Sequence, residues 1–274
     1  MTPLLSGSGV GSDRGVVTAR IVGSIFAALL PAGLAFGQAA ASDPAAAPIV
    51  TDRPAVTDSS IVVPSGSLQA ENGLADTVNH GQRTIDGSET LLRFGMASKT
   101  ELRLTVPDSF GRSGMSSGFG DLIIGMKQQL SPGAGSFNAS LVWSLSLPAG
   151  ARDISSHGYD PSVQLPWSQA LSANWTIAGM LSVYWPTQDG HRNTAGETTL
   201  LIDRQLTKAW DAFVEYAGDF PQAGGPRHLL HFGTALKPTP HQQLDFHFGV
   251  GLSSAAVNHF IGIGYSFRFQ ALRR

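Results

Sequence analysis

The sequence contains no cysteine. The protein therefore forms no disulfide, and it offers no thiolate to a metal ion or to nucleophilic catalysis. Charged residues are also scarce, at 14% of the chain against about 25% in an average soluble domain. The formal net charge of −2 leaves no basic excess of the kind that marks nucleic-acid binding. These shortages exclude a disulfide-stapled scaffold and argue against nucleic acid as a partner.

Long hydrophobic runs are missing as well. The main apolar stretch, residues 21–36, falls short of the roughly 20 residues that a membrane-spanning helix needs, and Pro31 interrupts it. Arg14 and Arg20 precede this stretch, and small residues follow it. Basic, apolar and small residues in this order indicate a secretory signal peptide rather than a membrane anchor. We predict a signal peptide and leader over residues 1–40.

The chain is rich in glycine, with 32 residues, and in a two-residue alternation of bulky and small side chains. In the segment 259–269, HFIGIGYSFRF, bulky apolar residues take every second place, and glycine, serine or arginine takes the places between them. Side chains alternate between the two faces of a strand, so this segment has one bulky face and one small face. The same alternation returns in residues 101–106, 121–127, 141–147, 175–185, 210–216 and 244–252.

We predict an all-β protein: a closed antiparallel up-and-down transmembrane β-barrel of about 12 strands over residues 67–269. After residue 41 no apolar run could serve as a membrane-spanning helix, and a chain that enters lipid without helices must close its sheet. Short turns alternate with longer, glycine-rich loops, as in outer-membrane barrels. The expected strands are residues 67–78, 88–97, 101–109, 118–130, 137–148, 160–171, 175–187, 197–206, 210–218, 227–237, 242–252 and 258–269.

The orientation of the two faces distinguishes a membrane barrel from a soluble β-sandwich or lipocalin. A soluble sheet turns its bulky face inward and exposes a face rich in Lys, Glu and Thr. Here the small face is mostly Gly, Ser and Ala, and four tryptophans share the bulky face: Trp143, Trp167, Trp175 and Trp185. Tryptophans near strand ends are typical of the aromatic girdle at a membrane interface. We therefore expect the bulky face to contact lipid.

The charged residues are distributed consistently with this orientation. A Lys or Arg that faces lipid at the bilayer midplane costs about 2–4 kcal/mol, and about 0–1 kcal/mol near the interface. Only Arg204 points outward, two residues from the end of its strand. The predicted lumen-lining charges of the strands are Glu71, Arg93, Glu101, Arg103, Asp121, Lys127, Asp203, Glu215, Lys237, Asp245 and Arg268.

Residues 41–66 precede the first expected strand, and the polar stretch 51–54 (TDRP) has no apolar face of its own. One hypothesis is that this segment folds back into the lumen as a plug. Asp52 and Arg53 would then line the lumen and pair with wall charges such as Arg93 and Glu71. The alternative is a periplasmic lead-in that caps the barrel.

Catalytic and metal-binding patterns are weak. Residues 114–118 fit G-x-S-x-G, but that motif needs a strand-to-helix turn, and here it falls in a loop between strands. His228 and His231 are three residues apart on one strand and face opposite ways, so they cannot share a metal ion. We therefore predict no catalytic residue, no cofactor, no metal site and no enzymatic activity.

Several segments resemble one family. They are residues 51–73, Glu89–Gly95, Glu101–Leu104, Ser117–Leu122 and Ser146–Gly150. Together they are similar, over most of residues 50–269, to the outer-membrane family described as "putative MetA-pathway of phenol degradation". The resemblance implies an outer-membrane β-barrel with a transport function. The chain departs from the usual aromatic terminus of such barrels, because a tail of residues 270–274 follows Phe269.

The leading hypothesis for function is an outer-membrane channel or transporter for small solutes, hydrophobic or aromatic ones included. The lumen charges would favour neutral or cationic molecules. Expected partners are the solute, outer-membrane lipid and the barrel-assembly machinery, in the bacterial outer membrane. Alternatives are a structural or adhesive barrel that acts through its long loops, and a lipid-modifying enzyme with a Ser-His pair on the lipid face. His259 has the parity for such a pair, but no suitable serine lies beside it.

Overall fold

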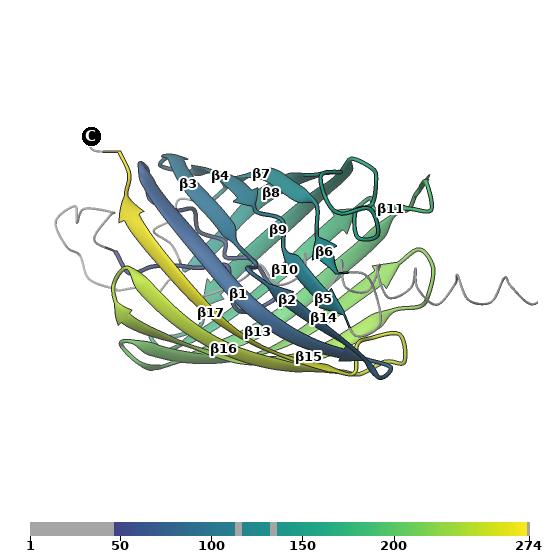
Figure 1. The fold of residues 1–274 in the computed structure, drawn as a ribbon. Helices are drawn as coiled ribbons and strands as arrows, with labels where there is room; N and C mark the ends of the chain where they lie inside the picture. The colour runs from purple at the N-terminus through teal and green to yellow at the C-terminus, as the bar shows by residue number, and fades with distance from the viewer. Residues whose placement is uncertain (1–46, 113–116, 132–135, 273–274) are drawn as a thin grey trace, which may run out of the picture.

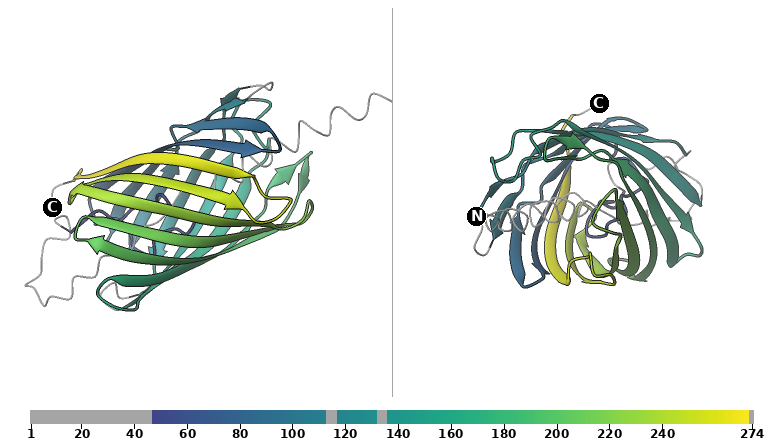
Figure 2. Two further views of the ribbon diagram at one scale, coloured as in Figure 1. Left: turned by 90° about the horizontal axis from the view of Figure 1, so that it is seen from below. Right: turned by 90° about the vertical axis from the view of Figure 1, so that its right-hand side faces the viewer.

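A computed structural model describes residues 47–112, 117–131 and 136–272. Within these ranges, no helix is long and apolar enough to cross a membrane. One antiparallel sheet of fifteen strands closes on itself because its first strand pairs with its last. Three of the fifteen strands are short pieces that continue a longer strand after a break. The closed wall therefore consists of twelve strand segments, which we call staves (Figure 1, Figure 2). The predicted fold class, an all-β, closed, up-and-down barrel, is confirmed.

The strands follow the chain around the barrel. Those of the wall are β1 (Ser67–Asn79), β2 (Gln82–Gly87), β3 (Leu91–Ala97), β4 (Thr100–Thr105), β5 (Ser109–Arg112), β6 (Gly118–Phe119), β7 (Leu122–Gln129), β8 (Phe137–Leu147), β9 (Asp160–Ala170), β10 (Trp175–Tyr184), β13 (Ala195–Thr207), β14 (Trp210–Pro221), β15 (Arg227–Thr239), β16 (Gln242–Gly251) and β17 (His259–Gln270). A separate hairpin consists of β11 (Thr187–Gln188) and β12 (His191–Arg192). The seam between β1 and β17 runs from the pair Ser67 and Gln270 to the pair Val78 and His259.

The wall differs from the expected strands in the region of β2 to β7. The wall strands are interrupted here at residues 88–90, 106–108 and 120–121. The first interruption lies at the start of the expected strand 88–97, and the other two lie within the expected strands 101–109 and 118–130. On one side of the first break Leu74 lies opposite Gly87, and on the other Glu71 lies opposite Leu91, so the second stave has one extra residue there. Ser88 in this β-bulge has a φ of +59°. A bulge shifts the alternation by one, which a strict two-residue pattern cannot reveal.

A tight turn joins β1 to β2, where we expected a longer loop over residues 79–87. His80 and Gly81 have φ values of +47° and +80°. Positive φ at both central residues is the signature of a two-residue hairpin turn whose twist matches its strands. The first two staves therefore extend beyond the length that the sequence pattern indicated.

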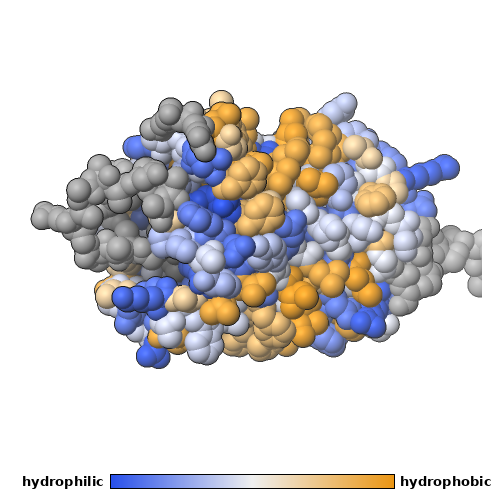
Figure 3. Space-filling model, turned by 60° about the vertical axis from the view of Figure 1, so that its left-hand side comes forward, coloured by the Kyte–Doolittle hydropathy of each residue, from blue (hydrophilic) through white to orange (hydrophobic). Residues whose placement is uncertain are grey.

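The outer face is apolar, as the alternation predicts. On β16, Leu244, Phe246 and Phe248 are exposed, whereas Asp245 and His247 between them are buried. Apolar side chains gather over the middle of the barrel surface in Figure 3. The outward residue Arg204 lies over the Trp175 ring, 5.1 Å from its centroid, where indole and guanidinium attract each other. An outward apolar band of this kind is typical of outer-membrane barrels.

Candidate functional site

The interior of the barrel holds residues 47–66, which we call the inner segment. Its residues 51–60 are all buried. The inner segment enters at the rim that carries the short turns, where the Ile49 amide donates to the Pro240 carbonyl (2.7 Å). It leaves at the same rim, where the Gly66 amide donates to the Gly95 carbonyl (2.7 Å). The segment is therefore a loop inserted into the lumen from one end.

The inner segment contains no helix or strand, so its buried backbone groups need partners from elsewhere. Wall carboxylates supply them. Glu71 of β1 accepts from the amides of Asp52 (2.8 Å) and Arg53 (3.0 Å). Glu215 of β14 accepts from the amides of Val56 and Thr57, both at 2.8 Å. The wall thus holds the inner segment through the segment's own backbone amides, which have no partner in a helix or strand.

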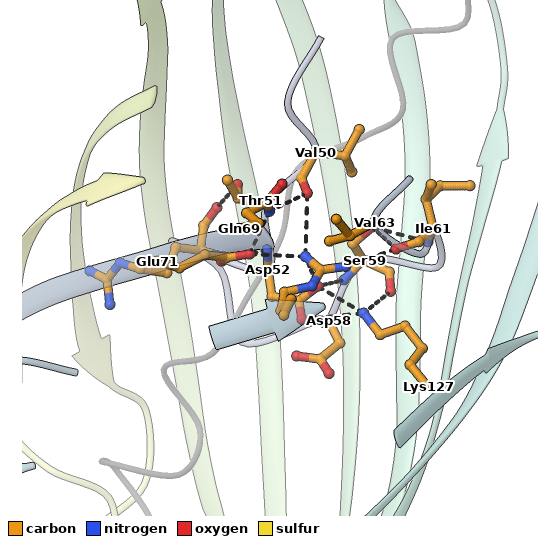
Figure 4. A network of polar contacts seen from close by, with 12 residues as sticks. Val50, Thr51, Asp52, Asp58, Ser59, Ile61, Val63, Gln69, Glu71 and Lys127 are labelled. Carbon is orange, nitrogen blue, oxygen red and sulfur yellow. Dashed lines mark hydrogen bonds and ion pairs between the residues drawn. The ribbon is translucent and has the colours of Figure 1, made fainter. Parts of the chain in front are cut away.

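A cluster of cations from three neighbouring strands surrounds Asp52, and Figure 4 shows one of them, Lys127, next to the inner segment. Arg93 of β3 lies 3.1 Å from its carboxylate and Lys127 of β7 lies 2.9 Å from it. Arg103 of β4 forms a further ion pair with the same carboxylate. Glu101 of β4 balances these charges by binding Arg93 at 2.8 Å. Removing one member of a buried ion network leaves an uncompensated charge, at a cost of about 3–5 kcal/mol.

The two carboxylates of the inner segment differ in their protonation. Although burial raises the pKa of Asp52, the charges of Arg103, Arg93 and Lys127 hold it below its ordinary value. For Asp58, burial and the nearby charge of Asp52 raise the pKa from 3.8 to about 7. Asp58 still contacts Arg103, with 3.1 Å between guanidinium and carboxylate. Asp52 is therefore a permanent anion, and Asp58 titrates near neutral pH.

The Arg53 side chain contacts the wall at β16, β17 and the β2–β3 connection, next to the strands that carry this cluster of cations. Its guanidinium forms ion pairs with Glu89 and, at 3.4 Å, with Asp245. It also donates to the Ile263 carbonyl (3.3 Å). Although burial lowers the pKa of Arg53, the carboxylates of Asp245 and Glu89 raise it above its ordinary value. The arginine is therefore fully charged inside the barrel.

A chain of buried polar groups links Arg53 to Glu215. The Arg53 guanidinium lies 3.5 Å from Nε2 of His247. Nδ1 of His247 lies 3.0 Å from Nε2 of His231, and Nδ1 of His231 lies 2.8 Å from Glu215. Because Glu215 also holds the backbone at Val56, two anchoring points of the inner segment share one network.

Apolar contacts complete the packing. Ala55 contacts Leu201 and Phe213, and Val56 belongs to a cluster with Leu229 and Phe260. These wall residues share the inner face with charged groups. The lumen is therefore less uniformly polar than the expected lining of Gly, Ser, Ala and charges, because some inward positions carry large apolar side chains.

The structure places the predicted lumen charges in several groups. Around the inner segment lie Glu71, Arg93, Glu101, Arg103, Lys127, Glu215 and Asp245, with Asp52 and Arg53 in the segment itself. Arg268 is buried and donates to the Ala47 carbonyl at the rim. Asp203 is buried on β13. Asp121 is half-buried, and its carboxylate accepts from the amides of Gly150 (3.0 Å) and Ser156 (3.1 Å).

The pairing of Arg53 differs from the expected one. Asp52 pairs with Arg93 as the hypothesis states, but the Arg53 guanidinium pairs with Glu89 and Asp245. The carboxylate of Glu71 instead accepts a hydrogen bond from the backbone amide of Arg53. Glu89 was not among the predicted site residues, although it has the same inward parity as Arg93 on the expected strand 88–97; it lies in the bulge between β2 and β3.

Other contributors were also missed. Asp58, His231 and His247 are buried next to the predicted charges. The inward parity of His231 and His247 was readable from their strands, but a histidine alone does not signal an ion network. His259, the candidate for a lipid-facing catalytic pair, lies opposite Val78 and Val250.

The fold is similar to that of solved outer-membrane proteins. The crystal structure of an outer membrane channel from Pseudomonas putida F1 aligns with a TM-score of 0.61 and 12% identity, over 76% of this chain and 97% of that chain. The NanC porin aligns with a TM-score of 0.53 and 9% identity, over 73% and 98%. The KdgM porin aligns with a TM-score of 0.52 and 11% identity, over 74% and 99%.

These likenesses show the fold, since each identity is low. No curated protein matches the sequence. The sequence itself matches a family model over residues 51–269, a range that includes most of the inner segment as well as the barrel. The chain belongs to the family described as "Putative MetA-pathway of phenol degradation".

Proposed function

We propose that the protein is a channel for small solutes in the bacterial outer membrane, and that the inner segment closes it. The observation that carries this proposal is the mode of attachment of residues 47–66. The wall closes through its own β1–β17 ladder, and the inner segment adds no strand to it. Displacing the segment would therefore break side-chain contacts and leave every ladder hydrogen bond of the wall in place.

Similar proteins support a channel. The three similar structures reported above bear the names outer membrane channel and porin, and the family description refers to phenol degradation. Phe110, Phe213 and Phe260 are buried on the inner side of the wall. Such rings offer apolar contacts to an aromatic or hydrophobic solute. We infer that neutral and aromatic solutes of low mass are within the range of the channel.

Planar-bilayer conductance tests this proposal. The full chain is compared with a variant that lacks residues 47–63 and keeps Gly66, which binds the rim through Gly95. We expect a steady current from the deletion variant and a closed or rarely open state from the full chain. Solute uptake by liposomes, with phenol as the probe, gives the second readout. A deletion variant that folds as a barrel but carries neither current nor phenol would contradict the proposal.

A further inference from the structure

We propose that the pocket around Arg53 is a binding site for small solutes that carry a guanidinium group, which compete with Arg53 for it. This inference rests on the proposed function, in which the inner segment is displaceable. In the closed barrel, Arg53 occupies the pocket as a tethered ligand. A free guanidinium compound would take the same place, and occupancy by the solute would release the segment.

The polar part of the pocket belongs to the wall. Glu89 and Asp245 form ion pairs with the Arg53 guanidinium, and the Ile263 carbonyl accepts a hydrogen bond from it. Side chains of Glu89 and Asp245 are 5% and 0% exposed. Two carboxylates and a carbonyl around one planar cation are the geometry that guanidinium recognition requires.

The shape of the pocket also comes from the wall. A Cβ added at Gly73 would lie 2.1 Å from Nη1 of Arg53, and one added at Gly264 would lie 2.5 Å from Nε. Such distances are impossible for real side chains. Glycines on β1 and β17, which are neighbours at the seam, therefore leave a flat slot for the guanidinium plane. Both glycines are wall residues, so the slot itself remains when Arg53 is replaced by alanine.

Electrostatics favours a replacement cation. If Arg53 leaves, Glu89 and Asp245 remain as buried carboxylates without their cation, and an uncompensated buried charge costs several kcal/mol. Within the described part of the chain, Glu89 Oε1 and Asp245 Oδ2 have no hydrogen-bond partner. The pocket thus holds more acceptors than Arg53 uses. A solute that brings its own guanidinium avoids the cost of an empty pocket.

The absence of cysteine provides a direct assay, because a single introduced thiol is unique. Ser60 is buried in the inner segment, with its Oγ 2.7 Å from Oγ of Ser168 on β9. In S60C, the rate of maleimide labelling in detergent reports how often the segment leaves its place. The R53A/S60C protein empties the pocket, so its labelling should be faster than that of S60C.

Methylguanidinium is the probe for chemical rescue. We expect it to slow the labelling of R53A/S60C by roughly tenfold at about ten times its Kd, because it refills the slot and stabilises the closed state. Urea, which has the shape without the charge, and tetramethylammonium, which has the charge without donors, should have no effect. In S60C with Arg53 intact, methylguanidinium should instead accelerate labelling by competition.

Two control proteins make the result specific. D52A/S60C loosens the same segment but leaves the pocket filled by Arg53, so methylguanidinium should not slow its labelling. R53A/E89Q/S60C should lose most of the rescue. If R53A/S60C does not fold as a heat-modifiable barrel, the competition measurement on S60C alone decides. Absence of both rescue and competition would overturn the inference.

The assay also separates this inference from the channel itself, because labelling needs no ion flow. If methylguanidinium slows the labelling of R53A/S60C but the deletion variant carries no current, the binding pocket is supported and the channel function is contradicted. If methylguanidinium has no effect on labelling but the deletion variant conducts, the channel function is supported and the binding pocket is contradicted.

Discussion

The Arg53 side chain fills the space that a side chain at Gly264 would need: a methyl group on the glycine would lie 2.5 Å from Nε of the arginine. The small face of the segment 259–269 therefore accommodates a particular side chain of the inner segment. The ring of His247 likewise packs against a glycine of β17, since a Cβ at Gly262 would lie 2.1 Å from its Nε2. The glycines of β17 therefore make room for Arg53 of the inner segment and for His247 beside it.

Gly264→Ala should displace Arg53 and weaken the closed state by about 1–3 kcal/mol, as overpacking does elsewhere. The open probability in planar bilayers should rise accordingly. Gly196→Ala is the matched control on β13, because the nearest atom to its added Cβ is 3.7 Å away. Equal open probabilities for the two variants would show that the slot does not control closure.

A reversible lock should distinguish movement of the inner segment from other gating. The Oγ atoms of Ser60 and Ser168 are 2.7 Å apart, so the cysteine pair S60C/S168C should form a disulfide between segment and wall. Under oxidation we expect no opening events, and under reduction the behaviour of the unmodified chain. The single variants S60C and S168C should show no redox dependence. Opening that persists in the fully oxidised pair would place the gate elsewhere.

The anchoring carboxylates should differ in importance. Glu215 accepts hydrogen bonds from the amides of Val56 and Thr57, whereas the Asp203 side chain is buried on β13 and its Oδ2 has no hydrogen-bond partner within the described residues. Glu215→Gln leaves fewer acceptors for these buried amides and should cost about 1–3 kcal/mol. Opening rates and thiol labelling of S60C should increase in Glu215→Gln and stay unchanged in Asp203→Asn. Similar behaviour of the two variants would mean that Glu215 does not anchor the segment.

Closure should depend on pH through Asp58, whose pKa is raised to about 7 in the closed state. Because the closed state binds this proton more tightly than a solvated segment does, closure is favoured at low pH. It weakens as pH rises from about 4 to about 7, by at most about 1.4 kcal/mol per pH unit. Asp52, with its lowered pKa, adds no dependence in this range, since it stays ionised in both states. Open probability should therefore rise between pH 5 and 7.

Asp58→Asn is the test of this assignment, because the amide cannot titrate. Its open probability should be flat over the range in which the unmodified chain responds. A pH response that survives in Asp58→Asn would assign the titration to another group.

The sequence predicted the wall well because a two-residue alternation carries both strand position and sidedness. The pattern in residues 242–252 and 258–269 places β16 and β17 within two residues of their observed bounds. The alternation was insufficient near Ser88, where one extra residue reverses the parity of β2 relative to β3. For that reason the sequence pattern did not reveal β2 as part of the wall.

The inner segment was only partly predictable. Its polarity and its lack of an apolar face indicated that Asp52 and Arg53 need charged partners. Which partners they have depends on contacts between residues far apart in the chain, such as Arg53 and Asp245. A single sequence contains no measure of such distances. Asp121 shows the same limit, because its parity was inward but its carboxylate binds the backbone of a loop.

The rim contacts of Gly66 have a consequence for biogenesis. Its carbonyl accepts from the amides of Ala271 and Leu272, both at 2.9 Å, just beyond the last strand. In a partly folded barrel, in which β1 and β17 have not yet paired, these hydrogen bonds to Gly66 cannot form. An unfinished molecule would therefore expose its N-terminal stretch to periplasmic proteases, whereas a completed one conceals it. Proteolytic survival of that stretch would thus record whether assembly reached its end.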